Sequence, residues 1–107
     1  MDVTVQVNVN EEKAEPKYYQ HEDIFVRFDV LKDGEPTKPN TVTVVVYDPD
    51  KEFLTREIPD IVDTEVSFML AGEMVEKVGG YTFVFKVGIM GFGTYNHVVK
   101  IDVLEGI

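Results

Sequence analysis

The sequence predicts an all-β protein, a seven-stranded β-sandwich with one short helical turn before the sixth strand. Apolar side chains recur at every second position in several short runs, which is the period of a half-buried strand. Valine dominates these runs and is joined by seven Phe and five Tyr, which favour strands. Gly, Pro and Asp turn signals separate the runs at regular intervals.

The first three strands are expected at 3–9, 24–30 and 42–47. Every odd position of 3–9 is valine, and apolar residues alternate with polar ones through 24–30. Asp33-Gly34 ends the second strand, and Pro36 and Pro39 are expected to hold the following loop out of any sheet. The third run is apolar on both faces in part, which is typical of a central strand.

The other four strands are expected at 53–58, 66–70, 81–87 and 95–103. Pro59 ends the fourth run, which we place at a sheet edge. The segment 71–80 combines helix formers with a glycine stop, so it predicts a helical turn that crosses between the sheets. The last two strands are joined by a tip rich in glycine.

Length, charge and composition limit the class of protein. The 107 residues suit one domain, 1–107, and the absence of cysteine excludes a disulfide-dependent scaffold. A net charge of −10 argues against nucleic acid and anionic membranes as partners. No apolar run is long enough to span a bilayer, and no signal peptide precedes the first strand. Either Met1 begins a piece of a larger exported protein, or the chain is complete and acts where it is made or in a particle.

Two motifs resemble immunoglobulin-like or fibronectin type III-like modules. The strand order, the helical turn and Gly80-Tyr81 entering the sixth strand are similar to such modules, and Val30 to Pro36 resembles the "dGkP" strand-turn of bacterial and macroglobulin-type members. The resemblance implies that Tyr81 is a corner tyrosine, whose hydroxyl binds the backbone of the preceding crossover. The chain departs from antibody domains because it lacks the paired cysteines and the core tryptophan.

In such a sandwich, successive loops alternate between two ends. One end would gather 10–23, 48–52 and 71–80 and hold half of the twenty acids. The other would gather 33–40, 59–63 and 88–93, and it carries large apolar side chains: Ile61, Val62, Ile89, Met90 and Phe92. These five residues form either a docking surface for a protein partner or a plug that folds back over the core.

The acidic end suggests a calcium site. Asp48, Asp50 and Glu52 stand at alternate positions, and Ca²⁺ takes several carboxylate oxygens. Lys51 lies inside this trio, so the alternative is a solvated acidic turn that aids solubility. We expect no other cofactor.

No catalytic constellation stands out in the sequence. Ser67 is the only serine, and alternation turns it outward without a glycine elbow or a neighbouring histidine. His97 is expected on the inward face of the last strand, and His21 lies far from it in sequence, so the two do not form a zinc site. We therefore expect a protein that is not an enzyme.

The leading hypothesis is a structural or protein-interaction module of a cell-surface or virus-particle assembly, which docks through its apolar end. The alternatives are a small soluble inhibitor or ligand-binding protein that uses the same loops, and a calcium-binding adhesion module. The expected partners are another protein or neighbouring domains. The first strand lacks the lysines that usually protect an edge, so it also suggests an edge-strand dimer.

Overall fold

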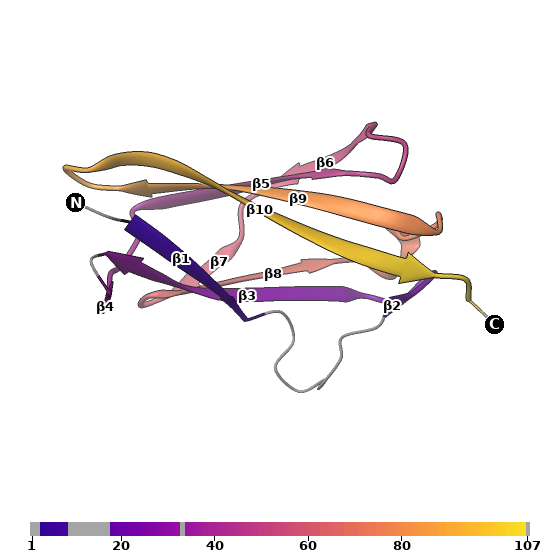
Figure 1. Cartoon of the computed structure of the whole chain (residues 1–107), viewed down its shortest axis with the longest axis horizontal. Helices are drawn as coiled ribbons and strands as arrows, with labels where there is room; N and C mark the ends of the chain where they lie inside the picture. Colours follow the sequence, from indigo (N-terminus) through magenta and orange to yellow (C-terminus); the bar gives the residue numbers. More distant parts are fainter. Residues whose placement is uncertain (1–2, 9–17, 33, 107) are drawn as a thin grey trace.

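The computed structural model describes residues 3–8, 18–32 and 34–106, with side chains from residue 18 onward. These residues form ten β-strands and one short 3₁₀-helix. The strands make two sheets that lie face to face (Figure 1). The chain is therefore an all-β sandwich, as the sequence predicts.

Sheet I has the strand order β1-β3-β8-β7, with β4 paired to the far part of β3. Its strands are β1 (Val3–Asn8), β3 (Ile24–Lys32), β8 (Glu65–Leu70), β7 (Asp60–Val62) and β4 (Glu35–Pro36). Sheet II has the order β2-β10-β9-β5-β6. Its strands are β2 (Tyr18–Tyr19), β10 (Gly93–Leu104), β9 (Gly79–Ile89), β5 (Thr41–Tyr47) and β6 (Phe53–Glu57).

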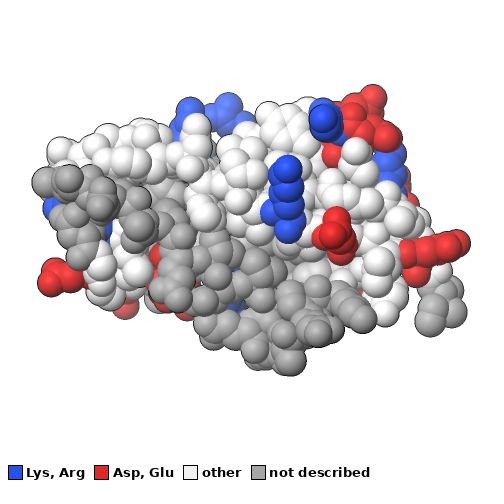
Figure 2. Space-filling model, viewed as in Figure 1, with Lys and Arg blue, Asp and Glu red and all other residues white. Residues whose placement is uncertain are grey.

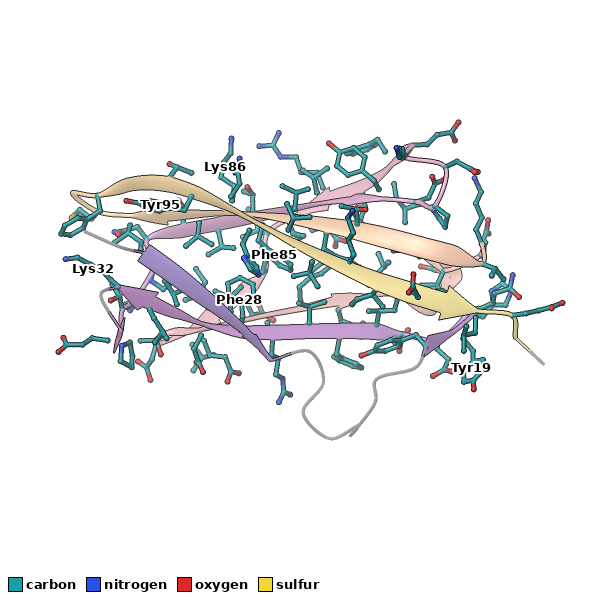
Figure 3. All side chains as sticks on the ribbon, in the orientation of Figure 1. Tyr19, Phe28, Lys32, Phe85, Lys86 and Tyr95 are labelled. Atoms are coloured by element: carbon teal, nitrogen blue, oxygen red, sulfur yellow. The ribbon has the colours of Figure 1, made fainter. Side chains whose placement is uncertain are left out.

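Alternation places one face of each long strand between the sheets. Phe28 from sheet I and Phe85 from sheet II point toward one another, with ring centroids 4.8 Å apart in an edge-to-face arrangement (Figure 3). Phe68 and Phe83 complete this aromatic centre. The inward-facing valines of β3, β5 and β9 surround it and are buried.

The seven predicted strands correspond to β1, β3, β5, β6, β8, β9 and β10, but the described residues contain three further short strands. Val9, the last residue of the predicted first strand, lies outside the described residues. The prediction that Pro36 stays out of any sheet is wrong, because Pro36 pairs with Leu31 in the β3–β4 hairpin. A proline is tolerated there since β4 is an outer strand with no neighbour on its other side in the described structure.

The segment predicted as a helical turn contains the 3₁₀-helix η1 (Gly72–Met74), which carries the chain from sheet I to sheet II. The N–H of Gly72 donates to Asp23 Oδ1 at 2.7 Å. A Cβ at position 72 would clash with the His21 carbonyl oxygen, so the close approach of these two backbones requires glycine. No helix in the described residues is long and apolar enough to cross a membrane.

Candidate functional site

The tip of the β9–β10 hairpin lies at the same end of the sandwich as the β3–β4 and β7–β8 turns (Figure 1). Two backbone hydrogen bonds extend the strand pairing at this end, one within each sheet. Val30 N–H donates to the Thr64 carbonyl at 2.9 Å, and Asn40 N–H donates to the Gly88 carbonyl at 2.8 Å. The β5–β6 loop and the η1 crossover lie at the opposite end, so the loops are divided between two ends as the sequence analysis expects.

The five apolar residues predicted for docking divide into two groups. Ile89 is only 5 % exposed, and Ile61 is half-buried against the core. Met90 is 76 % exposed, Val62 is also exposed, and Phe92 is 37 % exposed. The docking surface predicted from the sequence is therefore too large, because Ile89 and Ile61 serve the core.

Strand alternation explains the burial of Ile89 and the position of Ile61. Strand β9 extends two residues beyond the predicted 81–87, so Ile89 continues the inward series of Tyr81 to Val87. Ile61 belongs to β7 rather than to a loop, and it pairs with the buried Val66. The side chains left exposed at this end are Met90 and Phe92 on the hairpin tip and Val62 on β7. We call Met90 and Phe92 the tip surface.

The backbone of the hairpin tip is held by three hydrogen bonds. Met90 N–H donates to Asn40 Oδ1 at 2.6 Å, and the Tyr95 hydroxyl donates to the Phe92 carbonyl at 2.7 Å. Phe92 N–H closes the turn on the Ile89 carbonyl at 3.0 Å. Gly91 and Gly93 have φ of 83° and 105°, which a residue with a side chain rarely adopts. Met90 is therefore presented on an ordered turn.

Lys32, at the end of β3 in sheet I, lies against the tip surface. Its Nζ lies 3.3 Å from the centroid of the Phe92 ring, a cation–π contact that fixes the ring against the end of β3 (Figure 3). Lys32 and Asn40 are not among the site residues predicted from the sequence. Neither lies near Phe92 or Met90 in sequence, so only the pairing of the strands reveals them.

The predicted calcium site holds a lysine instead. Lys77 Nζ lies 2.9 Å from Asp48 Oδ2 and 2.7 Å from Asp50 Oδ2. The other oxygen of Asp48 accepts the N–H groups of Asp50 and Glu52, so it caps the loop. Among the described residues, no three His, Cys, Asp or Glu side chains are grouped to hold a metal ion. The prediction that Asp48, Asp50 and Glu52 ligate calcium is therefore not supported by the geometry, because an ammonium group occupies the position between the two aspartates.

These contacts change the acidity of the groups involved. The hydrogen bond from Lys77, followed by the hydrogen bond from the Glu52 N–H, lowers the pKa of Asp48. The hydrogen bond to Asp50, then that to Asp48, raises the pKa of Lys77. Figure 2 shows acidic and basic side chains gathered together at this end of the molecule.

Replacing Lys77 by Met is expected to lower the melting temperature at pH 7 and to weaken its dependence on acid. A carboxyl group whose pKa is lowered by folding stabilises the protein above its unfolded pKa of about 3.9, and this contribution is lost as the pH falls through the folded pKa. The variant lacks most of that contribution. Melting curves between pH 7 and pH 3 measure it, with Lys51→Met as the control because Lys51 lies in the same loop. Equal curves for the two variants would show that Lys77 has no special role.

The corner tyrosine implied by the resemblance is present. The Tyr81 hydroxyl donates to the Lys77 carbonyl at 3.1 Å and accepts the Lys77 N–H at 3.0 Å. Its ring is buried, and this burial raises the pKa of Tyr81. The same residue, Lys77, thus has its backbone held by Tyr81 and its side chain held by the acidic loop.

His97 and Ser67 lie in different parts of the structure. His97 lies half-buried on the inward side of β10, 5.9 Å from the Phe28 ring centroid, and its Nε2 is buried without a hydrogen-bond partner. Burial lowers the pKa of His97. Ser67 lines a hollow of about 310 Å³ on sheet I with Arg27, Phe25 and Met69. The two residues belong to opposite sheets and do not form a catalytic pair.

A scan against models of known protein families finds no match to this chain, and a comparison with curated proteins finds none either. Solved structures do match. CopC from Methylosinus trichosporium superposes with a TM-score of 0.65 at 11 % identity, covering 97 % of both chains. A superoxide reductase (neelaredoxin) from Ignicoccus hospitalis superposes with a TM-score of 0.53 at 17 % identity, covering 94 % of this chain and 80 % of the other.

The third similar structure is much larger than this chain. The β-glucuronidase of Parabacteroides merdae superposes with a TM-score of 0.62 at 14 % identity, covering 94 % of this chain but only 13 % of the enzyme. At these identities the likeness concerns the fold alone. The proteins that share it carry different names and functions, so the fold of this chain does not define its activity.

Proposed function

We propose that this protein is a non-enzymatic interaction module that docks onto a protein partner through the tip surface, in a cell-surface or virus-particle assembly. The observation that carries the proposal is the exposure of Met90, at 76 %, on a turn whose backbone is held by Asn40 and Tyr95. Exposed apolar side chains on an ordered loop are typical of recognition surfaces.

The chemistry of the tip surface suits a protein partner. A methionine side chain is flexible and polarizable, so it adapts to an irregular apolar pocket. The ordered backbone reduces the entropy that docking would cost. Lys32 lies beside Phe92, so the apolar centre has a polar rim, which is the usual arrangement of a protein interface.

We infer an immunoglobulin-like relationship, which is consistent with the same function. The inference is supported by the order β1-β3-β8-β7 in one sheet and β10-β9-β5-β6 in the other, and by the hydrogen bond from the Tyr81 hydroxyl to the crossover backbone. Modules with this architecture often bind through the loops at one end, which supports docking through the tip surface.

Photo-crosslinking tests the proposal. A benzoyl-phenylalanine at position 90, in the cells that express the natural gene, is expected to give one protein adduct. The same group at position 58 is the matched control, because Ile58 is 80 % exposed and lines the hollow on sheet I with Phe25 and Met69. Adducts of equal yield and identity at the two positions would contradict docking at the tip.

A second variant separates docking from folding. Met90→Asp is expected to weaken binding to the crosslinked partner by at least about tenfold, the effect of losing an interface anchor. Its unfolding free energy should stay within about 0.5 kcal/mol of the wild-type value, since the side chain is exposed. A large loss of stability would instead identify Met90 as part of the core.

A further inference from the structure

Within the described residues, strand β10 has a long edge without a strand partner, which we call the free edge. It pairs with β9 along Gly93–Val103, whereas its other neighbour, β2, pairs only with Val103 and Leu104. Figure 1 shows β10 running the length of the sandwich with β2 beside only its end. Strand β1 comes close to β10 but pairs with β3. Within the described residues, positions 94–102 therefore have a strand partner on one side only.

Two hydrogen bonds show which residues face this free edge. The Gly88 carbonyl accepts from Asn40, so Gly88 directs its backbone toward β5 and away from its β10 partner, Thr94. At the other end of the strand, the Leu104 carbonyl accepts from Gln20, on the β2 side. Because backbone groups alternate in direction along a strand, the even-numbered residues of β10 direct their N–H and C=O groups to the free edge. These residues are Thr94, Asn96, Val98, Lys100 and Asp102.

We propose that this edge pairs with the same edge of a second copy of the chain, antiparallel, with Val98 on the two-fold axis. In this register Val98 faces its own copy, Asn96 faces Lys100, and Thr94 faces Asp102. Every even-numbered residue of 94–102 then pairs with an even-numbered residue of the other copy. The backbone N–H and C=O groups along both free edges are therefore hydrogen-bonded. The two copies then share one continuous sheet.

The side chains of the free edge favour a second copy as the occupant. Val98 is 51 % exposed at the midpoint of the edge, and pairing covers it with an identical apolar side chain. No two like charges lie opposite one another, since Lys100 faces an amide and Asp102 faces a hydroxyl. Antiparallel pairing also keeps the two acidic ends apart, which matters for a chain of net charge −10.

The free edge of β10 is a better site than the edge predicted from the sequence. Strand β1 does lie at the edge of sheet I, but it has only six residues. The free stretch of β10 is longer, and its self-pairing would place the two Met90 tips roughly 45 Å apart, from about 3.3 Å per strand residue. Such a dimer would present two docking tips at opposite ends.

Sedimentation of the purified protein over a range of concentrations tests the proposal. The wild type is expected to show a monomer–dimer equilibrium, and Val98→Pro should shift it to monomer. The Val98 N–H points away from β9, so proline there removes no bond of the β9–β10 ladder, and an unchanged melting temperature verifies the fold. A wild type that stays monomeric at every concentration would overturn the proposal.

Disulfide trapping tests the register, because the chain contains no cysteine. Val98→Cys should form a covalent dimer at least about tenfold faster than Ile58→Cys, since facing Cα atoms in such a pair lie about 5.5 Å apart, within disulfide reach. Asn96→Cys alone and Lys100→Cys alone should each form disulfide-linked dimers slowly. When the two variants are mixed, they should link to each other quickly, because position 96 of one copy faces position 100 of the other. Equal rates for Val98→Cys and Ile58→Cys, or a mixture no faster than its components, would contradict this interface.

Discussion

Replacing Phe85 by Ala is expected to lower the free energy of unfolding by about 3–5 kcal/mol, the usual cost of deleting a buried phenyl ring. Phe85 is fully buried and lies edge-to-face against Phe28 at 4.8 Å. Its ring also lies near those of Phe68 and Phe83, with centroids 6.4 Å and 6.5 Å away. The truncation would therefore leave a cavity at the point where the two sheets meet, and side chains held on paired strands can fill it only in part.

Urea denaturation followed by circular dichroism measures this loss, with Phe53→Ala as the control. Phe53 is an exposed phenylalanine on the edge strand β6, so its removal should change the unfolding free energy by no more than about 0.5 kcal/mol. If the two variants were equally stable, the aromatic cluster would not be the centre of the core.

The main strands could be predicted from the sequence because each buries one face. The odd positions of 81–89 and the even positions of 24–30 are the ones that the structure buries. The short strands could not be predicted in this way. Two or three residues are too few to show a period, and β2, β4 and β7 form because longer strands offer them free edges.

The described turns lie at two ends of the sandwich, as the alternation of the strands predicts, but the contacts at each end could not be predicted. Lys51 is the cation that the sequence places within the acidic loop, but in the structure the cation bound there is Lys77, 29 positions from Asp48. At the other end, Lys32 reaches Phe92 from the opposite sheet. Such partners depend on how two sheets pack, and a pattern read along one strand carries no information about it.

The two ends differ in what their contacts achieve. At the acidic end, Lys77 binds both Asp48 and Asp50, so the charged groups satisfy one another. At the tip, the hydrogen bonds fix only the backbone, and the Met90 side chain stays exposed. This contrast favours the tip as the surface that a partner covers.

Replacing Tyr81 by Phe is expected to lower the free energy of unfolding by about 1–3 kcal/mol, because both backbone groups of Lys77 lose their partner in a partly buried position. Tyr47→Phe is the control, since it removes a hydroxyl from the outer face of β5 and should cost no more than about 0.5 kcal/mol. Equal losses in the two variants, measured by urea denaturation, would contradict a corner role for Tyr81.

A role of Tyr81 in orienting the Lys77 side chain toward the acidic loop can be measured separately from the hydrogen bonds that the Tyr81 hydroxyl makes. If Tyr81 orients Lys77 toward Asp48, then Tyr81→Phe should also weaken the loss of stability between pH 7 and pH 3 that the lowered pKa of Asp48 produces. A double-mutant cycle with Lys77→Met measures this coupling, because contacting residues depart from additivity. Additive losses would mean that Tyr81 braces the crossover backbone without orienting the lysine side chain.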